Sequence, residues 1–413
     1  MTSHEMPTST ETSLSVQDLP LLDITTPGFT WEGPEVAAAR QKHWAARSPV
    51  GLLVLRFAEA AELLHDPRLV QDLGSLVERA GAVSGPLHDQ ATLSLQSRAG
   101  TDHRRRRGGL VARHFSAAHV AKMRPFIRAT AHTLAEQLAT VGPCDFVNAF
   151  AEPLPLTVIC HLLGIPPGDR DLIHHPAKGA GLLLALDYNP DLLPLVEAGI
   201  VALTDYVETL IRGRVAEPGS DGLLSHLLRA TQDDNVDERE LGGLVVDLLT
   251  AGFNTVSHQL SLAMVAFAQH PEQWFMLRER PELAEQAVDE ILRYCPTTAT
   301  IWRRAATDLD YQGLHIPAHT LVHLVVYSAH RDPMAFPDGD TFDIATARNA
   351  PLLTFGGGAH FCPGTALSRS ELTESLTALT THHGPPRITG PITWRPPIGV
   401  CGPETLPLTF GPP

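Results

Sequence analysis

The sequence predicts a mainly helical fold with small β-sheets. Between residues 35 and 300, long stretches place apolar residues at three- and four-residue steps, as one face of an α-helix does. Short runs of β-branched and apolar residues, separated by proline and glycine, appear only late in the chain. The apolar fraction of 43% and the charged fraction of 19% are typical of an ordinary globular protein. The 413 residues are therefore expected to bury a large helical core.

The chain begins with a polar segment. Residues 1–20 are rich in Ser, Thr and Pro, and we expect them to be disordered. They lack the basic and apolar regions of a signal peptide, and no run of about 18 apolar residues occurs, so we expect neither secretion nor a membrane span. Residues 21–413 show no internal repeat or break in composition, and we expect them to form a single domain.

Periodicity locates the main elements along the chain. Helices are predicted over residues 36–47, 117–141, 195–217 and 241–270. The last of these is apolar on almost every face, so it is expected to cross the core. Strands are predicted within residues 309–317, 320–330 and 405–411, and a further helix over residues 365–383.

Charge and cysteine content exclude some classes of function. The net charge of −15 argues against a nucleic-acid-binding protein. The five cysteines are scattered and odd in number, which is expected in a reducing compartment, and we expect a cytoplasmic location. No two cysteines have the CxxC spacing of a zinc site.

One cysteine, Cys362, lies in the glycine-rich stretch LLTFGGGAHFCPGTALSRSE, residues 352–371. A phosphate-binding loop needs a lysine after the glycines, and a dinucleotide fingerprint needs a glycine where Phe361 stands, so both are excluded. A glycine-rich turn with an incidental cysteine is the simplest alternative. The full pattern F-G-x-G-x-H-x-C-x-G is more demanding, and it is filled by Phe355, Gly356, Gly358, His360, Cys362 and Gly364. Glycines let the backbone approach a flat ligand, and a following helix N-terminus favours a thiolate, so Cys362 is predicted to be a metal ligand.

This pattern resembles the haem-thiolate loop of the cytochrome P450 family, and three more segments match in the expected order. The motif EILR resembles the family's E-x-x-R pair, which implies a buried network of Glu290 and Arg293; taken alone, this spacing is typical of a surface pair. The stretch IWRRAATDLDYQG implies that Arg303 binds a haem propionate, since the register to Gly313 selects it over Arg304. The stretch TDHRRRRGGLVARHFS implies that His103 and Arg107 do the same. The arginines between them are expected to form a solvated basic face.

The resemblance covers the chain from about residue 20 to its end, and it implies the cytochrome P450 fold. It implies haem b (iron protoporphyrin IX) as cofactor, with Cys362 as its axial ligand and with Phe355, His360 and Gly364 in contact with it. Dioxygen would be the co-substrate and a small organic molecule the substrate. Ferredoxin and ferredoxin reductase would be the electron donors, because the sequence contains no flavin or nicotinamide motif. The alternative is a haem-thiolate binding or sensing protein without turnover, and Thr255 favours the enzyme.

The central helix departs from the family at one position. The family pattern [AG]-G-x-[DE]-T corresponds to residues 251–255, with Ala251 and Thr255 retained and Asn254 in place of the acid. An asparagine can hydrogen-bond but cannot relay a proton by ionising. Either Asn254 helps to hold the helix, or proton delivery is reduced and radical coupling or desaturation is favoured over hydroxylation. The sequence leaves both interpretations open.

The resemblance also implies a set of substrate-facing residues. The central helix would contribute Leu248, Ala251 and Thr255, and the segment after the E-x-x-R helix would contribute Thr298 and Ala299. The C-terminal hairpin would contribute Val400, and some part of residues 80–97 would complete the wall. Most are small or apolar, which indicates an organic substrate of medium size. Soluble bacterial members of the family commonly tailor secondary metabolites such as macrolides, aromatic polyketides or cyclic dipeptides, so the resemblance implies a tailoring step of this kind.

Asp247 is an acid where relatives usually have an apolar residue. Steps of four from Thr255 lead through Ala251 to Asp247, so the three share one face of the helix. A carboxylate in an apolar helix interior is costly unless it is paired. Its partner is either an Arg or His from another helix, or an N–H or amine of the substrate.

Overall fold

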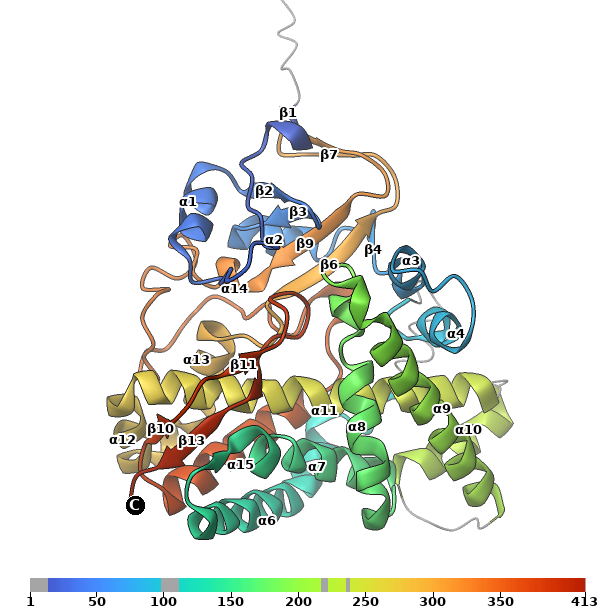
Figure 1. The fold of residues 1–413 in the computed structure, drawn as a ribbon, viewed down its shortest axis with the longest axis vertical. Coiled ribbons are helices and arrows are strands. Elements are labelled where there is room, and N and C mark those ends of the chain that lie inside the picture. The colour runs from blue at the N-terminus through green and yellow to red at the C-terminus, as the bar shows by residue number, and fades with distance from the viewer. Residues whose placement is uncertain (1–13, 98–110, 217–221, 235–237, 413) are drawn as a thin grey trace, which may run out of the picture.

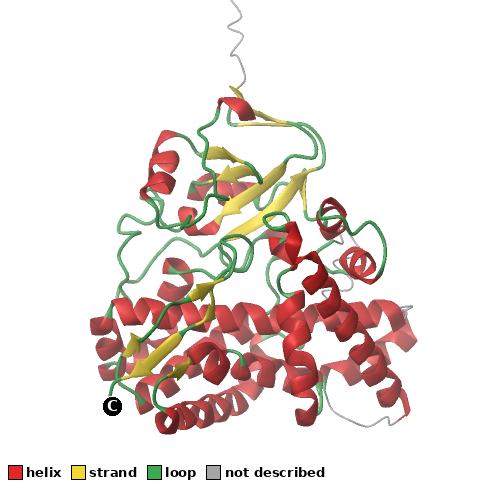
Figure 2. Cartoon of the chain, in the orientation of Figure 1, coloured by secondary structure: helices red, strands yellow, loops and turns green. Residues whose placement is uncertain are grey.

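The computed structural model of the protein describes residues 14–97, 111–216, 222–234 and 238–412 (Figure 1). Helices predominate in this part of the chain and the sheets are small, which confirms the predicted fold class (Figure 2). No helix among these residues is both long and apolar enough to span a membrane.

The helices of the described residues form most of the molecule. They are α1 (Pro34–Lys42), α2 (Phe57–Leu63), α3 (Leu73–Arg79), α4 (Pro86–Leu93), α6 (Ala117–Val141), α7 (Pro153–Leu163), α8 (Arg170–Ala180), α9 (Leu193–Ala216), α10 (Leu223–Asp234), α11 (Glu238–Gln269), α12 (Pro271–Glu279), α13 (Ala284–Tyr294), α14 (Val326–Ala329) and α15 (Thr365–His382).

The strands form four sheets in the described part of the chain. The largest has the order β2-β3-β9-β6-β4, from Ala45–Ser48, Gly51–Val54, Leu321–Val325, Thr300–Ala305 and Leu69–Val70. A second has the order β1-β8-β7, from Leu14–Ser15, Leu314–Ile316 and Leu309–Tyr311. A third has the order β10-β13-β5, from Pro386–Ile388, Pro407–Phe410 and Cys144–Asp145, and the last pairs β11 (Thr393–Trp394) with β12 (Pro403–Thr405).

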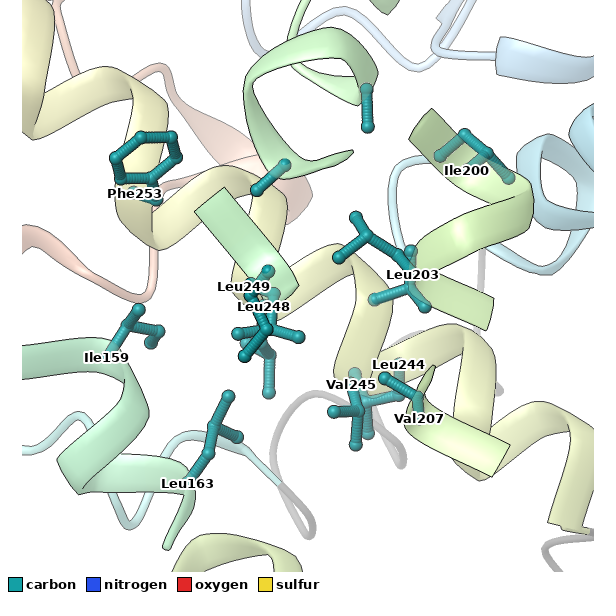
Figure 3. Close-up of a cluster of buried hydrophobic side chains, with 14 of the residues drawn as sticks. Ile159, Leu163, Ile200, Leu203, Val207, Leu244, Val245, Leu248, Leu249 and Phe253 are labelled. Carbon is teal, nitrogen blue, oxygen red and sulfur yellow. The ribbon is translucent and has the colours of Figure 1, made fainter. Parts of the chain in front are cut away.

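Helix α11 crosses the helical layer from one side to the other (Figure 1). Most of its side chains are buried, as its nearly continuous apolar sequence predicted. Figure 3 shows its Leu244, Leu248 and Phe253 within a cluster of apolar side chains from neighbouring helices. Gly252 lets α7 approach closely, because a Cβ there would lie 2.8 Å from Ile159 Cδ1. Helices α7 and α11 are thus packed closely at this point.

Two predicted boundaries were wrong. The helix predicted over residues 36–47 ends at Lys42, because Ala45–Ser48 instead pair with Gly51–Val54 in an antiparallel hairpin. Pro49 favours an extended residue before it, and the buried Ala45 and Ala46 gain strand pairing and packing that a continued helix would lose. In the predicted strand region 320–330, β9 ends at Val325 and a short helix, α14, follows.

The N-terminal segment differs in part from expectation. Leu14 and Ser15, which lie within the segment expected to be disordered, pair in parallel with Leu314 and His315 of β8. This pairing supplies backbone hydrogen bonds that the polar composition did not reveal. Residues 1–13 lie outside the described part of the chain.

Candidate functional site

A large cavity lies between α11, strand β6 and the loop that carries Cys362. It contains about 1390 Å³ free of protein atoms, its opening to solvent included. Ten of the residues predicted to act together line it: Asp247, Leu248, Ala251, Thr255, Thr298, Arg303, Phe355, His360, Cys362 and Val400. Residues far apart in sequence therefore converge on one site.

Glycines shape the loop that presents Cys362. Gly356 and Gly358 have φ values of +74° and +63°, in the left-handed region that favours glycine. The Cys362 backbone N–H donates to Phe355 O at 2.8 Å, which closes the loop on itself. Helix α15 begins at Thr365, and the Thr365 hydroxyl donates to Cys362 O at 2.8 Å. The thiol thus lines the cavity close to a helix N-terminus, where a thiolate is favoured.

A buried ion pair lies beneath this loop. Arg293 Nε and Nη2 each donate to a different carboxylate oxygen of Glu290 at 2.7 Å, and both side chains are at most 1% exposed. Arg293 also donates to backbone carbonyls of three residues, His330, Gly339 and Thr341. The pair at i,i+3 is therefore part of the core in this chain and does not lie on its surface.

His330 connects this ion pair to the loop. Its Nδ1–H donates to Arg293 O at 3.2 Å, and its Nε2 accepts from Leu353 N at 2.9 Å. Burial and the positive charge of Arg293 lower the pKa of His330 to about 3, so the ring stays neutral and keeps both roles. Leu353 O in turn accepts from Gly356 N, so the ion pair supports the loop that carries Cys362.

Arg303 lies on β6 with its guanidinium at the wall of the cavity. It is 2% exposed and donates to Gln71 Oε1 at 3.0 Å and to Trp302 O at 2.9 Å. Burial lowers its pKa to about 10, so the side chain remains charged at neutral pH. Trp302 is also among the lining residues, and its buried Nε1 has no hydrogen-bond partner among the described residues. A buried cation at the wall of the cavity fits the acidic propionate of a haem.

We expect Arg303→Ala to release haem at least about tenfold faster than the unchanged protein. The reason is that a propionate buried beside β6 would lose its cation, and an unpaired buried charge is costly. Arg304→Ala is the matched control, because the next residue on the strand instead pairs with Asp72 at 2.9 Å. Transfer of haem to excess apomyoglobin measures the rate, and equal rates for the two variants would contradict the assignment of Arg303.

The α11 face that lines the cavity carries three polar residues, Asp247, Thr255 and Gln259. Thr255 Oγ1 donates to Ala251 O at 2.9 Å, so its hydroxyl is bonded along the helix and lies at the cavity. Asp247 Oδ1 accepts from Gln90 Nε2, and its Oδ2 accepts from Leu95 N, each at 3.0 Å. The carboxylate that the helical spacing placed on this face therefore also anchors the segment after α4.

Asn254 does not line the main cavity. It lines a smaller adjoining one together with Ala251, Thr255 and Asp247, which line both. The Asn254 side chain is 3% exposed, and its Nδ2 donates to Ala177 O on α8 and to Thr250 O. Its position favours the interpretation that Asn254 holds the helix.

Other predicted residues lie elsewhere. Ala299 is buried in the apolar cluster around Val325 and Tyr327 and does not line the cavity. Gly364 also stays outside the cavity lining, although a Cβ on it would lie 3.6 Å from Cys362 Sγ. His103 and Arg107 lie outside the described residues.

Several residues of the cavity were not predicted individually. Leu95 and Gln96 belong to the segment 80–97 that was expected to contribute, whereas Gln71, Leu184 and Trp302 were not identified. Gln71 Nε2 donates to Gln96 Oε1 at 2.7 Å, so these side chains form a polar chain that ends at Arg303. The pairing of β4 with β6 brings Gln71 close to Arg303, and no sequence motif marks Gln71 as a residue of the site.

Comparison with known proteins gives a consistent result. The profile of the family "Cytochrome P450" matches residues 208–382. Luteothin monooxygenase of Streptomyces thioluteus is 47% identical over 407 residues, which cover 98% of this chain and all of that protein. Nocardicin C N-oxygenase of Nocardia uniformis subsp. tsuyamanensis is 34% identical over 307 residues, or 73% of this chain and 75% of that protein.

Solved structures agree in fold. The cytochrome P450 enzyme CxnD for C–S bond formation in chuangxinmycin biosynthesis superposes with a TM-score of 0.84 and 30% identity, covering 96% of this chain and 99% of that chain. P450BioI in complex with an acyl carrier protein superposes with a TM-score of 0.83 and 28% identity, covering 91% of this chain and 98% of that chain.

Proposed function

Because the chain belongs to the cytochrome P450 family, we propose that Cys362 is the axial thiolate ligand of its haem and that substrate is oxidised in the cavity beside it. The protein is an oxidoreductase of the monooxygenase type that acts on an organic substrate in secondary metabolism. Its relatives are named for oxygenation reactions, which favours turnover over a sensing protein. The observation that carries the proposal is that Cys362 and the α11 face of Thr255 line one cavity.

The proposed cofactor is haem b. When bound, iron protoporphyrin IX with a thiolate ligand supplies the binding and reductive activation of dioxygen. Cys362 would hold the iron, and Arg303 would bind a propionate. Gly356 would allow the backbone to approach the ring plane, and Phe355 and His360 would lie in the same loop as the thiolate.

The remaining cavity residues would bind and orient the substrate. Leu248, Ala251 and Val400 offer small apolar contacts, and Asp247 and Gln96 add hydrogen-bonding groups. Thr255 Oγ1 can hold a proton at the wall of the cavity, and its bond to Ala251 O sets its direction. A largely apolar molecule of medium size with a polar group, such as an aromatic polyketide, fits these walls.

Oxygen insertion is the reaction we favour, since the relative that matches over its full length is named a monooxygenase. Bond-forming oxidation is a second candidate. Asn254 cannot ionise at the position where the family has an acid, which is compatible with this candidate, although its contacts favour a structural role. CxnD, which resembles this chain in fold, is described as acting in C–S bond formation.

Ferredoxin and ferredoxin reductase are the proposed electron donors. The sequence contains no flavin or nicotinamide motif, so the electrons must come from a separate donor. We also propose a cytoplasmic location, because all five cysteines are free, as expected in a reducing compartment.

Substrate screening tests the proposal. The haem-containing protein is titrated with macrolides, aromatic polyketides and cyclic dipeptides, and the Soret band is followed. We expect at least one class to shift the band and to raise electron-donor consumption in the presence of ferredoxin and its reductase. Binding without any rise in donor consumption would favour the sensing alternative.

We propose further that Asp247 accepts a hydrogen bond from an N–H or amine of the substrate. On this basis Asp247→Asn is expected to weaken substrate binding by about 1.5–3 kcal/mol, the range for hydrogen bonds to charged groups, with haem content unchanged. Asp247→Leu is expected to shift the site of attack as well. The Soret titration measures the binding.

The two Asp247 variants separate the two roles of the carboxylate. The amide oxygen introduced by Asp247→Asn could still accept a hydrogen bond from Leu95 N, whereas the side chain introduced by Asp247→Leu could not. Normal substrate affinity in Asp247→Asn but weak affinity in Asp247→Leu would leave Asp247 only as the anchor of the segment after α4.

A further inference from the structure

The carboxamide of Asn254 is engaged on both sides. Its Nδ2 donates to Ala177 O at 2.8 Å and to Thr250 O at 3.0 Å. Its Oδ1 accepts from Arg395 Nη1 at 3.5 Å, the long end of hydrogen-bond range. An aspartate could accept from Arg395, but as a carboxylate it has no N–H for the two carbonyls. The surroundings therefore select an amide at this position.

Gly181 leaves the space that Asn254 occupies. A Cβ on Gly181 would lie 2.4 Å from Asn254 Cγ and 2.5 Å from Nδ2, much closer than side-chain contacts allow. The φ of Gly181 is −65°, which any residue adopts, so the backbone does not require glycine here. The requirement comes from the neighbouring carboxamide.

Arg395 is a buried cation with a fixed position. Its side chain is 1% exposed and lies 3.2 Å from Glu404. Its Nη1 donates to His258 Nε2 at 2.7 Å, while His258 Nδ1–H donates to Pro403 O at 3.0 Å. These two bonds define the neutral tautomer of His258, and burial together with the charge of Arg395 keeps the pKa of this ring well below its usual value.

The ion pairs continue to helix α8. Lys178 lies 3.3 Å from Glu404 and 2.8 Å from Glu152, so two cations and two carboxylates alternate along the network. Lys178 follows Ala177, whose carbonyl accepts from Asn254. Asn254, at the centre of α11, therefore contacts both helix α8 and the C-terminal segment.

We propose that Gly181 and Arg395 lock the Asn254 carboxamide and thereby position Ala251 and Thr255 at the cavity. Both are positioning residues, since they act through Asn254 and do not line the main cavity. Thr255 follows Asn254 directly, and Ala251 O accepts the Thr255 hydroxyl, so a displaced Asn254 would turn this helix segment. The inference rests on the proposed function, in which this segment lies over the iron.

Second-site rescue tests the lock. Gly181→Ala is expected to raise the dissociation constant of imidazole, an iron ligand that must fit beside Thr255, by about tenfold in the haem-containing protein. In an Asn254→Ala background the added methyl has room, so Gly181→Ala is expected to change the constant less than twofold. Gly213→Ala is the control, because no atom lies within 4 Å of its Cβ position, and it should leave imidazole binding unchanged.

Arg395 is tested in the same way, by comparing its variant with and without Asn254→Ala. Arg395→Gln is expected to weaken imidazole binding about fivefold, and in the Asn254→Ala background this effect should disappear, since residues that act through one another are not additive. Arg387→Gln, an exposed arginine on the nearby β10, should have no effect. Effects of Gly181→Ala and Arg395→Gln that persist in full without Asn254 would overturn the lock.

Two accompanying measurements separate the possible failures. A glycine needed only for stability would lower the unfolding temperature in Gly181→Ala while imidazole affinity stayed normal, and this result would also overturn the proposal. The absorption of the reduced carbon monoxide complex is recorded on every variant. If every variant keeps a normal thiolate spectrum but the Gly181 and Arg395 substitutions weaken imidazole binding as much without Asn254 as with it, only the proposed role of Gly181 and Arg395 is refuted. If the unsubstituted protein shows no thiolate spectrum, the proposed function itself is refuted.

Discussion

Cys362→Ala is expected to abolish thiolate ligation completely. Cys362 is the one cysteine among the residues that line the cavity, and all five cysteines lie in the described part of the chain. Burial raises the pKa of Cys160, Cys295 and Cys401 to about 12, so these three stay protonated at neutral pH and are poor ligands. None of them can replace the lost thiolate.

Electron paramagnetic resonance of the ferric protein measures this loss. The thiolate-ligated low-spin signal should be absent from Cys362→Ala and present in Cys401→Ala, the matched control. Cys362→His is expected to retain haem with weaker electron donation to the iron. A thiolate signal that persisted in Cys362→Ala would require another ligand and would contradict the assignment.

Replacing Arg293 by Lys is expected to lower the free energy of unfolding by at least about 1.5–3 kcal/mol, the range for one lost hydrogen bond to a charged group. A lysine keeps the charge but cannot reproduce the two-pronged contact with Glu290 and the bonds to three carbonyls. Because His330 links Arg293 to Leu353, the variant should also bind haem less tightly.

Urea unfolding monitored by circular dichroism gives the free energy. The control is Arg280→Lys, which alters an exposed pair with Glu282 and should change stability by less than about 1 kcal/mol. Equal stabilities of the two variants would mean that the buried network does not support the fold.

The elements with strong periodicity could be predicted from the sequence. The helix over residues 117–141 has the predicted bounds, and the long apolar helix around Gly252 crosses the core as expected. Their local pattern and their tertiary environment favour the same structure. Residues 45–47 were mispredicted because pairing with a later strand overrides the helical pattern of the preceding residues.

The site could be predicted only where a motif marks it. The spacing around Cys362 and the E-x-x-R pair identified residues that the fold does bring to the cavity or bury beneath it. Gln71 and Arg395 carry no such mark, because their partners Arg303 and Asn254 lie 232 and 141 residues away in the chain. Likewise, the helical spacing placed Asp247 on the cavity face but could not reveal its bond to Leu95 N.

The absorption spectrum of the reduced carbon monoxide complex tests the central claim most directly. The unchanged protein, purified with its haem and reduced by dithionite, is exposed to carbon monoxide, and the Soret band is recorded. Ligation by the Cys362 thiolate predicts a single, strongly red-shifted band, because the thiolate donates electron density to the iron. A band at the position found for histidine-ligated haem proteins would contradict the assignment of this chain as a haem-thiolate oxygenase.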